Sequence, residues 1–280
     1  MFGGFYTMGG GHFWEDVFFY QKWRIQRNYI TKRCRLLDNW DICRSEGSFE
    51  ECRQAFIEYI EAFELPRQKG HMIIMLPGLG ESKNIFKPLW RAALKEGFLA
   101  AAINYPSTQK ELDGHVRQLD FFLNHLEDVD KISFVTNGIG SVILKRLFTL
   151  ETQWRRKLKI GRAVEVRPQN HGSLLLKKLS KSKLFSFILG PMAAEMDPLN
   201  IEKIPPLPQE IETGLILGES QTISLLEKIT GTTPDRLSAE SEKHFEKAID
   251  AVEISSRKIN IFKDPKIVDA VISFLSTGKF

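Results

Sequence analysis

From residue 71 onward, short apolar runs alternate with longer segments in which apolar residues recur every three or four positions. The short runs indicate buried strands, and the longer segments indicate amphipathic helices. Strands are expected at 71–76, 99–104, 131–136, 160–166, 213–218 and 250–255, and helices at 83–97, 112–128, 141–158 and 264–275. This alternation predicts an α/β fold with a mostly parallel central sheet flanked by helices.

The first 68 residues follow a different pattern. Apolar positions at helical spacing predict one helix in WEDVFFYQKWRIQRNYI (14–30) and a second in SFEECRQAFIEYIEAF (48–63). Ser48 and Glu51 match a capping box before the second helix, and Leu65-Pro66 ends it. We therefore expect a helical N-terminal extension over residues 1–68, followed by an α/β domain over residues 69–280.

Residues 172–210 do not fit the strand–helix alternation. They contain LLLKKLSKSKLFSFILGPMAAEM and the proline-rich IPPLP. In parallel sheets, ligands bind at the carboxyl ends of the strands. We interpret the segment as a small inserted cap over that end of the sheet.

Composition narrows the classes of function. A net charge of +4 over 280 residues is too small to indicate a nucleic-acid partner. The three cysteines, Cys34, Cys43 and Cys52, lack the spacing of a zinc site and are expected to be free thiols. No metal-binding, dinucleotide or P-loop motif occurs, so we expect no metal and no cofactor.

The N-terminal residues bear on location. The first 24 residues lack the pattern of a secretory signal, and no apolar run approaches the roughly 20 residues of a membrane span. We expect a cytoplasmic protein. The basic and aromatic run from Lys22 to Arg35 has two interpretations, a helix lying on an anionic membrane surface or a solvated helix face packed on the main domain. The second is the commoner arrangement, and peripheral membrane contact stays a hypothesis.

The stretch KISFVTNGIGSVILKRLF (131–148) predicts a buried strand, a tight glycine turn and a helix. Many hydrolases present a nucleophilic serine on such a turn, in the pattern G-x-S-x-G. Here the turn reads Thr136-Asn137-Gly138-Ile139-Gly140, so its central position has no side chain. Gly138 and Gly140 preserve the backbone freedom and close packing that the turn needs.

Five stretches in order resemble the α/β-hydrolase superfamily, and in particular its bacterial lipase- and esterase-like branch. The resemblance covers about residues 70 to 280 and lies in MLPGLGES, INYPST, FVTNGIGSVILKRL, RPQNHGS and DPKIVDAVISFLSTGKF. It implies an α/β-hydrolase-like fold. It also implies a site in which a serine, a histidine and a carboxylate act beside backbone N–H groups that hold an oxyanion.

The resemblance assigns these roles to particular positions. The nucleophile position holds Gly138, the acid position Asp235 and the base position Lys258. Asp235 also fits as the N-cap of a helix starting near Ser238. Pro77 stands where the family has a histidine. The ligand and oxyanion region is assigned to Gly78, Leu79, Gly80, Asn137, Ile139, Gly140, Asn170 and His171.

Substitute catalytic groups are few. Ser141 is expected inside the helix after the turn, where its hydroxyl serves a backbone carbonyl. His171 is the one histidine expected near the pocket, and no nucleophile accompanies it. His244 precedes the last strand and belongs to a polar helical stretch.

Three hypotheses about function follow. The first is a hydrolase-like protein that has lost hydrolytic activity and binds an acyl or ester-like small molecule or a protein partner. The second is an active carboxylic-ester hydrolase with an atypical catalytic set. The third, compatible with the first, is a peripheral membrane protein that uses the N-terminal segment.

Overall fold

The computed structural model describes residues 5–6, 13–218, 247–254, 256 and 260–280. Its centre is a six-stranded sheet in the order β11-β10-β9-β8-β6-β7, with every neighbouring pair parallel. The strands are β6 His71–Leu76, β7 Leu99–Ala102, β8 Lys131–Asn137, β9 Lys159–Val166, β10 Thr213–Leu217 and β11 Asp250–Glu253. The mostly parallel sheet predicted from the sequence is confirmed.

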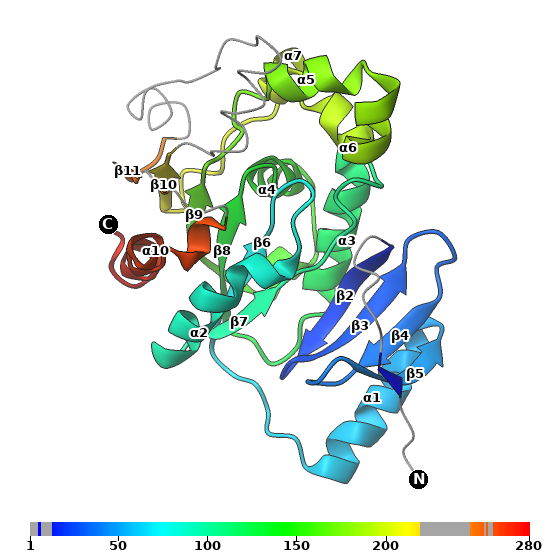
Figure 1. The fold of residues 1–280 in the computed structure, drawn as a ribbon. Helices are drawn as coiled ribbons and strands as arrows, with labels where there is room; N and C mark the ends of the chain where they lie inside the picture. The colour runs from blue at the N-terminus through cyan, green and yellow to red at the C-terminus, as the bar shows by residue number, and fades with distance from the viewer. Residues whose placement is uncertain (1–4, 7–12, 219–246, 255, 257–259) are drawn as a thin grey trace.

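Helices cover both faces of this sheet (Figure 1). On one face lie α2 Lys87–Lys95 and α10 Pro265–Thr277, and on the other α3 Leu112–Asn124 and α4 Gly140–Phe148. Strand β6 shows why its sequence is apolar throughout. Met72, Ile74 and Leu76 join the core under α3 and α4, whereas Ile73 and Met75 join the core under α2 and α10. A strand buried on both faces loses the polar alternation of a half-exposed strand. Short 3-10 turns lie at η1 Lys83–Phe86, η2 Trp154–Arg156 and η3 Ile261–Lys263.

The helix predicted over residues 14–30 is wrong. Residues 14–30 do not form a helix but the hairpin of β2 Trp14–Tyr20 and β3 Trp23–Asn28. With β4 Cys34–Leu37, β5 Ile42–Gly47 and β1 Phe5–Tyr6 they form an antiparallel sheet in the order β1-β5-β4-β3-β2, here called the N-terminal sheet.

Two local features explain the wrong helix prediction. A bulge between Asp16 and Phe18 buries the adjacent Val17 and Phe18 together, so the apolar spacing no longer alternates strictly. Gln21 and Lys22 both have positive φ, which suits a two-residue hairpin turn. The aromatic and β-branched residues of this segment favour strands, and that preference decided the structure. The amphipathic helix on which the membrane-contact hypothesis rested is therefore absent.

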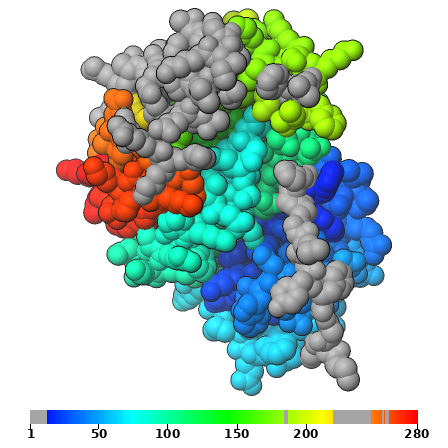
Figure 2. Space-filling view, in the orientation of Figure 1, coloured from blue at the N-terminus to red at the C-terminus, as the bar shows by residue number. Residues whose placement is uncertain are grey.

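The second predicted N-terminal helix is confirmed as α1 Phe49–Phe63. The hydroxyl of Ser48 accepts a hydrogen bond from the N–H of Glu51, whose carboxylate accepts one from the N–H of Ser48. Its face bearing Cys52, Phe56 and Tyr59 packs on the N-terminal sheet. In Figure 2 this blue N-terminal part and the cyan and green core form one continuous body.

Residues 172–210, which we call the cap, contain α5 Leu174–Ser180, α6 Lys183–Glu195 and α7 Pro198–Ile201. In Figure 1 these helices lie at the top of the view, above α4. Helix α6 is broken at Gly190, where φ is +72°, and Pro191 follows. Met192 and Met196 join the core beneath. No helix among the described residues is both long and apolar enough to cross a membrane.

Candidate functional site

The turn between β8 and α4 has the shape of a nucleophile elbow. Gly138 follows the last residue of β8 with φ +51°, and its N–H donates to the Val166 carbonyl at 3.0 Å. Two residues later α4 begins at Gly140, where an added Cβ would lie 2.8 Å from the Leu76 carbonyl oxygen. That distance is too short for any residue with a Cβ. The elbow therefore needs glycine at Gly140, and positive φ favours glycine at Gly138.

Few atoms of the described residues lie near the central position of the elbow. A Cβ added to Gly138 would meet one described atom within 4 Å, the Gly78 Cα at 3.9 Å. No described side chain has moved in to fill the place of a nucleophile. The position thus keeps the room for a small reactive side chain while holding none.

Two backbone N–H groups remain where an oxyanion would bind. They belong to Leu79, in the loop after β6, and to Ile139, the residue after the elbow centre. Neither has a hydrogen-bond partner within the part of the chain that the structure describes. By contrast, the Gly80 N–H donates to the Ser107 hydroxyl at 2.9 Å, and Pro77 has no N–H to offer. These two N–H groups stand at positions where the resemblance implies oxyanion donors, and that role stays a prediction.

The carboxylate of Glu81 lies against the loop after β6 and the last residue of β8, and we call this place the corner. One oxygen of Glu81 accepts hydrogen bonds from the Gly78 N–H and from the Asn137 side-chain amide, both at 2.7 Å. An added Cβ on Gly78 would lie 2.8 Å from that oxygen, so the carboxylate packs directly on the loop backbone. Negative charge here opposes the negative charge that develops on a carbonyl oxygen during ester hydrolysis.

The surroundings of Glu81 are buried and polar. The Tyr105 hydroxyl donates to the Pro77 carbonyl, and burial together with the Glu81 charge raises the pKa of Tyr105 well above its usual value. Burial lowers the pKa of Arg167, an effect that the Glu81 charge opposes. The corner therefore contains a carboxylate, a phenol and a guanidinium within electrostatic reach of one another.

Ser141 is not a displaced nucleophile. It is fully buried, its hydroxyl donates to the Gly138 carbonyl at 2.8 Å, and it accepts from the Gln169 N–H at 3.3 Å. The first bond lies within the elbow, and the second holds the elbow against the loop after β9. The role expected for it, service to a local backbone carbonyl, is confirmed.

Asn170 is turned into the protein. Its side-chain oxygen accepts from the Lys145 ammonium at 2.5 Å, and its amide donates to Glu165 at 3.2 Å. All three residues are almost completely buried. This network ties the loop after β9 to α4. His171 follows in the same turn and is partly buried, and a ligand contact for it stays a prediction.

A serine–histidine contact does occur, but at the other end of the sheet. The His71 Nε2 lies 2.8 Å from the Ser133 hydroxyl, which also accepts from the Arg162 N–H. Ser133 is fully buried, and an added Cβ on Gly161 would lie 2.4 Å from its oxygen. With no room for a substrate, this pair is structural.

Several predicted positions lie outside the described residues, namely Asp235, Lys258 and His244. The acid and base positions thus stay predictions from the resemblance. Within the described ranges, no group of histidine, cysteine and carboxylate side chains is arranged to hold a metal ion.

The sequence reasoning missed Glu81 and Ser107. Both lie in stretches already quoted for the resemblance, MLPGLGES and INYPST. The available signal for Glu81 was a carboxylate three residues after Gly78, in the loop that the resemblance assigns to the oxyanion. Nothing in the local pattern indicated that Ser107, 27 positions from Gly80, would bond to its N–H.

Comparisons with known proteins add the following. No protein-family model and no curated protein matches the chain. A monoacylglycerol lipase from Paleococcus ferrophilus is 16% identical, with a TM-score of 0.48 over 73% of this chain and 93% of that one. An esterase from Exiguobacterium antarcticum is 10% identical, with a TM-score of 0.48 over 75% and 93%. A methylesterase from Arabidopsis is 12% identical, with a TM-score of 0.47 over 73% and 98%.

These similarities are too low to carry an argument about activity. The α/β-hydrolase-like description of the core rests on the molecule itself, through its parallel sheet with helices on both faces and its strand–turn–helix elbow at β8 and α4.

Proposed function

We propose that this protein is an α/β-hydrolase-like protein without hydrolytic activity, which binds an acyl or ester-like ligand, or a protein partner, at the elbow. The observation that carries the proposal is Gly138, at the centre of an otherwise complete elbow. A hydrolase of this type needs a side-chain nucleophile at that position.

The charge of the corner supports the loss of hydrolysis. When triad residues are removed from a hydrolase, the oxyanion hole and substrate binding still give a residual acceleration of about 10³–10⁴-fold. Here Glu81 is bonded to Gly78, next to Leu79, and to Asn137, two residues before Ile139, and so places a negative charge beside that hole. We expect even the residual acceleration to be reduced.

The same corner supports binding. The N–H groups of Leu79 and Ile139, which bond to none of the described residues, suit a carbonyl oxygen, which accepts hydrogen bonds without bearing full charge. Among the described residues, only the Gly78 Cα would contact a Cβ at Gly138, which supports room for a small ligand group there. A neutral ester or amide carbonyl fits these features better than a carboxylate, because Glu81 repels an anion.

The proposal includes a cytoplasmic location. Cys34, Cys43 and Cys52 are buried free thiols, which suits a reducing compartment. Burial raises the pKa of Cys52 to about 12, so its reactive thiolate form is scarce at neutral pH.

Hydrolysis is tested with p-nitrophenyl acetate and butyrate, together with a serine-directed fluorophosphonate probe. We expect no turnover above the rate of a Gly140→Val variant, in which the elbow cannot keep its shape, and no labelled serine. Turnover at ordinary esterase rates that this variant abolishes would favour the active ester hydrolase instead.

Binding is tested by ligand-observed NMR with methyl butyrate. We expect saturation transfer to methyl butyrate from the native protein and from Gly138→Ala, and its loss in Gly138→Phe. The two variants share the cost of a Cβ at positive φ, but only phenylalanine fills the space. Equal transfer in all three proteins, or none in the native protein, contradicts binding at the elbow.

A further inference from the structure

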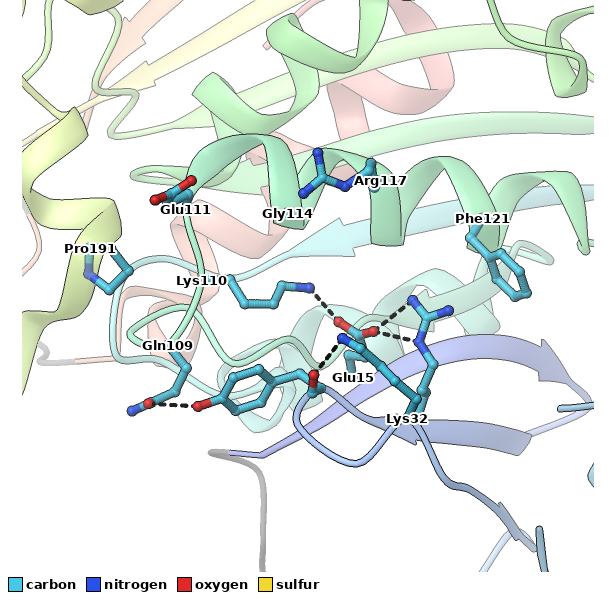
Figure 3. Close-up of a pocket in the computed structure, with 11 residues that line it drawn as sticks. Glu15, Lys32, Gln109, Lys110, Glu111, Gly114, Arg117, Phe121 and Pro191 are labelled. Carbon is cyan, nitrogen blue, oxygen red and sulfur yellow. Dashed lines mark hydrogen bonds and ion pairs between the residues drawn. The ribbon is translucent and has the colours of Figure 1, made fainter. Parts of the chain in front are cut away.

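A pocket lies where the N-terminal sheet meets the core, among residues that do not belong to the elbow. It has a volume of about 590 Å³ and lies between the β2–β3 hairpin, the start of α3 and Pro191 of α6 (Figure 3). Volumes of about 300–1,000 Å³ are usual for sites that bind small molecules. Its charged lining consists of Arg27, Lys32, Lys110, Arg117, Glu15 and Glu111. Four cations and two carboxylates give a formal charge of +2.

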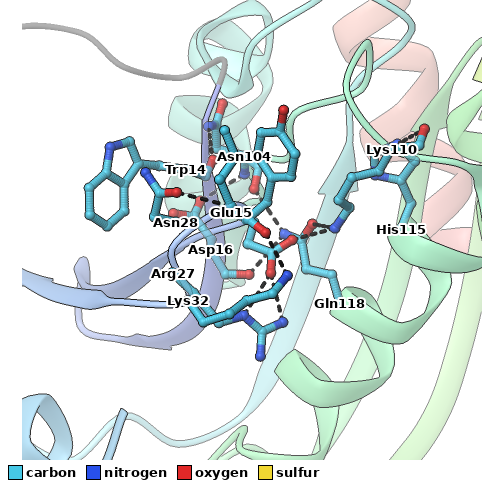
Figure 4. A network of polar contacts seen from close by, with 12 residues as sticks. Trp14, Glu15, Asp16, Arg27, Asn28, Lys32, Asn104, Lys110, His115 and Gln118 are labelled. Atoms are coloured by element: carbon cyan, nitrogen blue, oxygen red, sulfur yellow. Dashed lines mark hydrogen bonds and ion pairs between the residues drawn. The ribbon is translucent and has the colours of Figure 1, made fainter. Parts of the chain in front are cut away.

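Glu15 holds two of the cations in place. Its side chain is about 2% exposed, and one of its oxygens accepts from Arg27 Nε and Nη2, each at 2.7 Å. Its other oxygen pairs with the Lys110 ammonium, which also lies 3.2 Å from the Gln118 side-chain oxygen. Figure 4 shows these groups converging between β2 and α3. A buried ion pair adds little net stability, so stability alone does not account for this arrangement.

Neighbouring contacts fix the same groups further. Asp16, next to Glu15 in β2, exchanges two hydrogen bonds with Asn104, at 2.9 Å and 2.7 Å. The Arg27 guanidinium lies over the Phe121 ring, 5.1 Å from its centroid. Burial lowers the pKa of Lys110, an effect that Glu15 opposes. The cations behind the pocket are thus positioned before any ligand arrives.

Two further cations stand at the rim, and neither forms an ion pair with a carboxylate of the described residues. The Lys32 ammonium donates to the Tyr29 carbonyl at 2.5 Å, a neutral acceptor. Within the described part of the chain, Arg117 makes no hydrogen bond or ion pair. Figure 3 shows Arg117 on α3, across the pocket from Lys32 and Glu15. The positive charge of these two side chains remains available to an anion that enters.

We propose that this pocket binds a small organic phosphate, with the phosphate group held by Lys32 and Arg117 in front of the Arg27–Glu15–Lys110 cluster. A phosphate monoester carries a charge of about −1.5 to −2 at pH 7, which matches the formal charge of the lining. Arginine and lysine are the usual phosphate ligands in proteins. The rings of Tyr29 and Phe121 line the pocket beside these cations and suit an apolar or aromatic organic group.

The test is isothermal titration calorimetry of the full chain with phenyl phosphate. It is run at about pH 7.5, above the second pKa of the phosphate, and about 0.15 M ionic strength. We expect a Kd below about 1 mM, and at least about tenfold weaker binding to a Lys32→Gln/Arg117→Gln variant. Both side chains are exposed, so the variant should keep the thermal midpoint of the native protein.

A matched control is available at another pocket of about 570 Å³, between α2 and α10, whose lining includes Arg91, Lys95, Glu96 and Asp269. There the charges cancel, so an Arg91→Gln/Lys95→Gln variant removes the same charge from the protein without touching the proposed site. Its affinity for phenyl phosphate should equal that of the native protein.

The outcomes separate the proposal from its alternatives. Equal weakening by both double variants indicates attraction to net charge alone and overturns the proposed site. Undiminished binding by the Lys32→Gln/Arg117→Gln variant, or no saturable binding to the native protein at about 1 mM, also overturns it. Inorganic phosphate should bind more weakly than phenyl phosphate, and phenol should not bind. Equal affinity for inorganic phosphate overturns the organic part of the proposal, and equal affinity for phenol overturns the phosphate part.

Discussion

The elbow and the pocket around Glu15 and its cations, here called the basic pocket, differ in which atoms form them. At the elbow the backbone supplies nearly everything, through Gly138, Gly140 and the N–H groups of Leu79 and Ile139. At the basic pocket the side chains supply everything, and Glu15 organises them. A site built from backbone keeps its shape when its one reactive side chain is absent. A site built from charged side chains depends on each of them.

One segment connects the two regions. Residues 103–111 follow β7 and carry Ser107, which accepts from the Gly80 N–H of the oxyanion loop, and Gln109, which accepts from the Tyr29 hydroxyl of the basic pocket. Thr108 between them packs against Gly190 of the cap, where no Cβ would fit. Each region can therefore be changed separately, and the stability and activity of the whole protein can be measured.

The largest expected effect comes from the side-chain-built region. Replacing Glu15 by alanine leaves Arg27 and Lys110 without their shared buried carboxylate, which typically costs about 3–5 kcal/mol. The free energy of unfolding, measured by urea titration, should fall by that amount. Asp113→Ala is the control, because it breaks an exposed pair with Arg146 and should cost at most about 1 kcal/mol. A similar cost for both variants would mean that Glu15 does not organise the pocket.

The next effect belongs to the backbone-built region. Gly140→Ala places a Cβ 2.8 Å from the Leu76 carbonyl oxygen, and the overpacking should cost about 2–3 kcal/mol. Gly114→Ala is the matched change inside α3, where the new Cβ would lie 3.3 Å from the Lys110 Cβ, a milder contact. The gain in helix propensity of up to about 1 kcal/mol opposes this contact, so the variant should change the free energy of unfolding by less than about 1 kcal/mol. Thermal and urea unfolding measure both, and equal effects would show that the elbow tolerates a looser geometry.

The sequence predicted the core better than the N-terminal part for a physical reason. In the core, each strand is buried on both faces and each helix has one apolar face, so pattern and structure agree, as in β6 and α10. In residues 14–30 a bulge at Val17 removed the strand period, and the positive φ of Gln21 and Lys22 left no trace in the hydrophobic pattern. Tertiary contacts and the strand propensity of its residues determined the structure of that segment.

The candidate site was predictable to the extent that it is local. Gly138 and Gly140 follow from one turn motif, and the structure gives them the geometry that the motif requires. The Glu81–Asn137 contact joins residues 56 positions apart, and the Arg27–Glu15–Lys110 cluster spans 95 positions. Side-chain contacts across such distances require the folded chain.

A pH dependence is expected from a histidine of α3 that lies against the segment linking the two regions. His115 is buried beneath residues 103–111, and burial lowers its pKa from 6.5 to about 3. The folded protein therefore resists protonation while the unfolded chain accepts a proton, so stability is full above about pH 6.5 and falls as the pH drops towards 3. Between pH 7 and pH 5 this group should remove about 2 kcal/mol.

The measurement is the free energy of unfolding against pH for the native protein and for His115→Gln. The variant should lose about 2 kcal/mol of the change between pH 7 and pH 5, whatever its stability at neutral pH. His71, whose pKa is lowered to about 4 by burial, acts in the same direction, over a pH window that ends about one unit higher. Parallel pH curves for native protein and variant would show that the pKa of His115 is the same in the folded and unfolded states.

The smallest effect is expected from restoring the missing side chain. Gly138→Ser returns a hydroxyl to the centre of the elbow, where a Cβ would meet just one atom of the described residues within 4 Å, the Gly78 Cα at 3.9 Å. Hydrolysis of p-nitrophenyl acetate should nevertheless rise less than about tenfold, because the Glu81 carboxylate still opposes an oxyanion. Adding Glu81→Gln removes that charge and should give a further rise of about tenfold. Ordinary esterase rates from Gly138→Ser alone would mean that one substitution silenced an otherwise intact catalytic set, and the elbow would then differ from an active one by a single side chain.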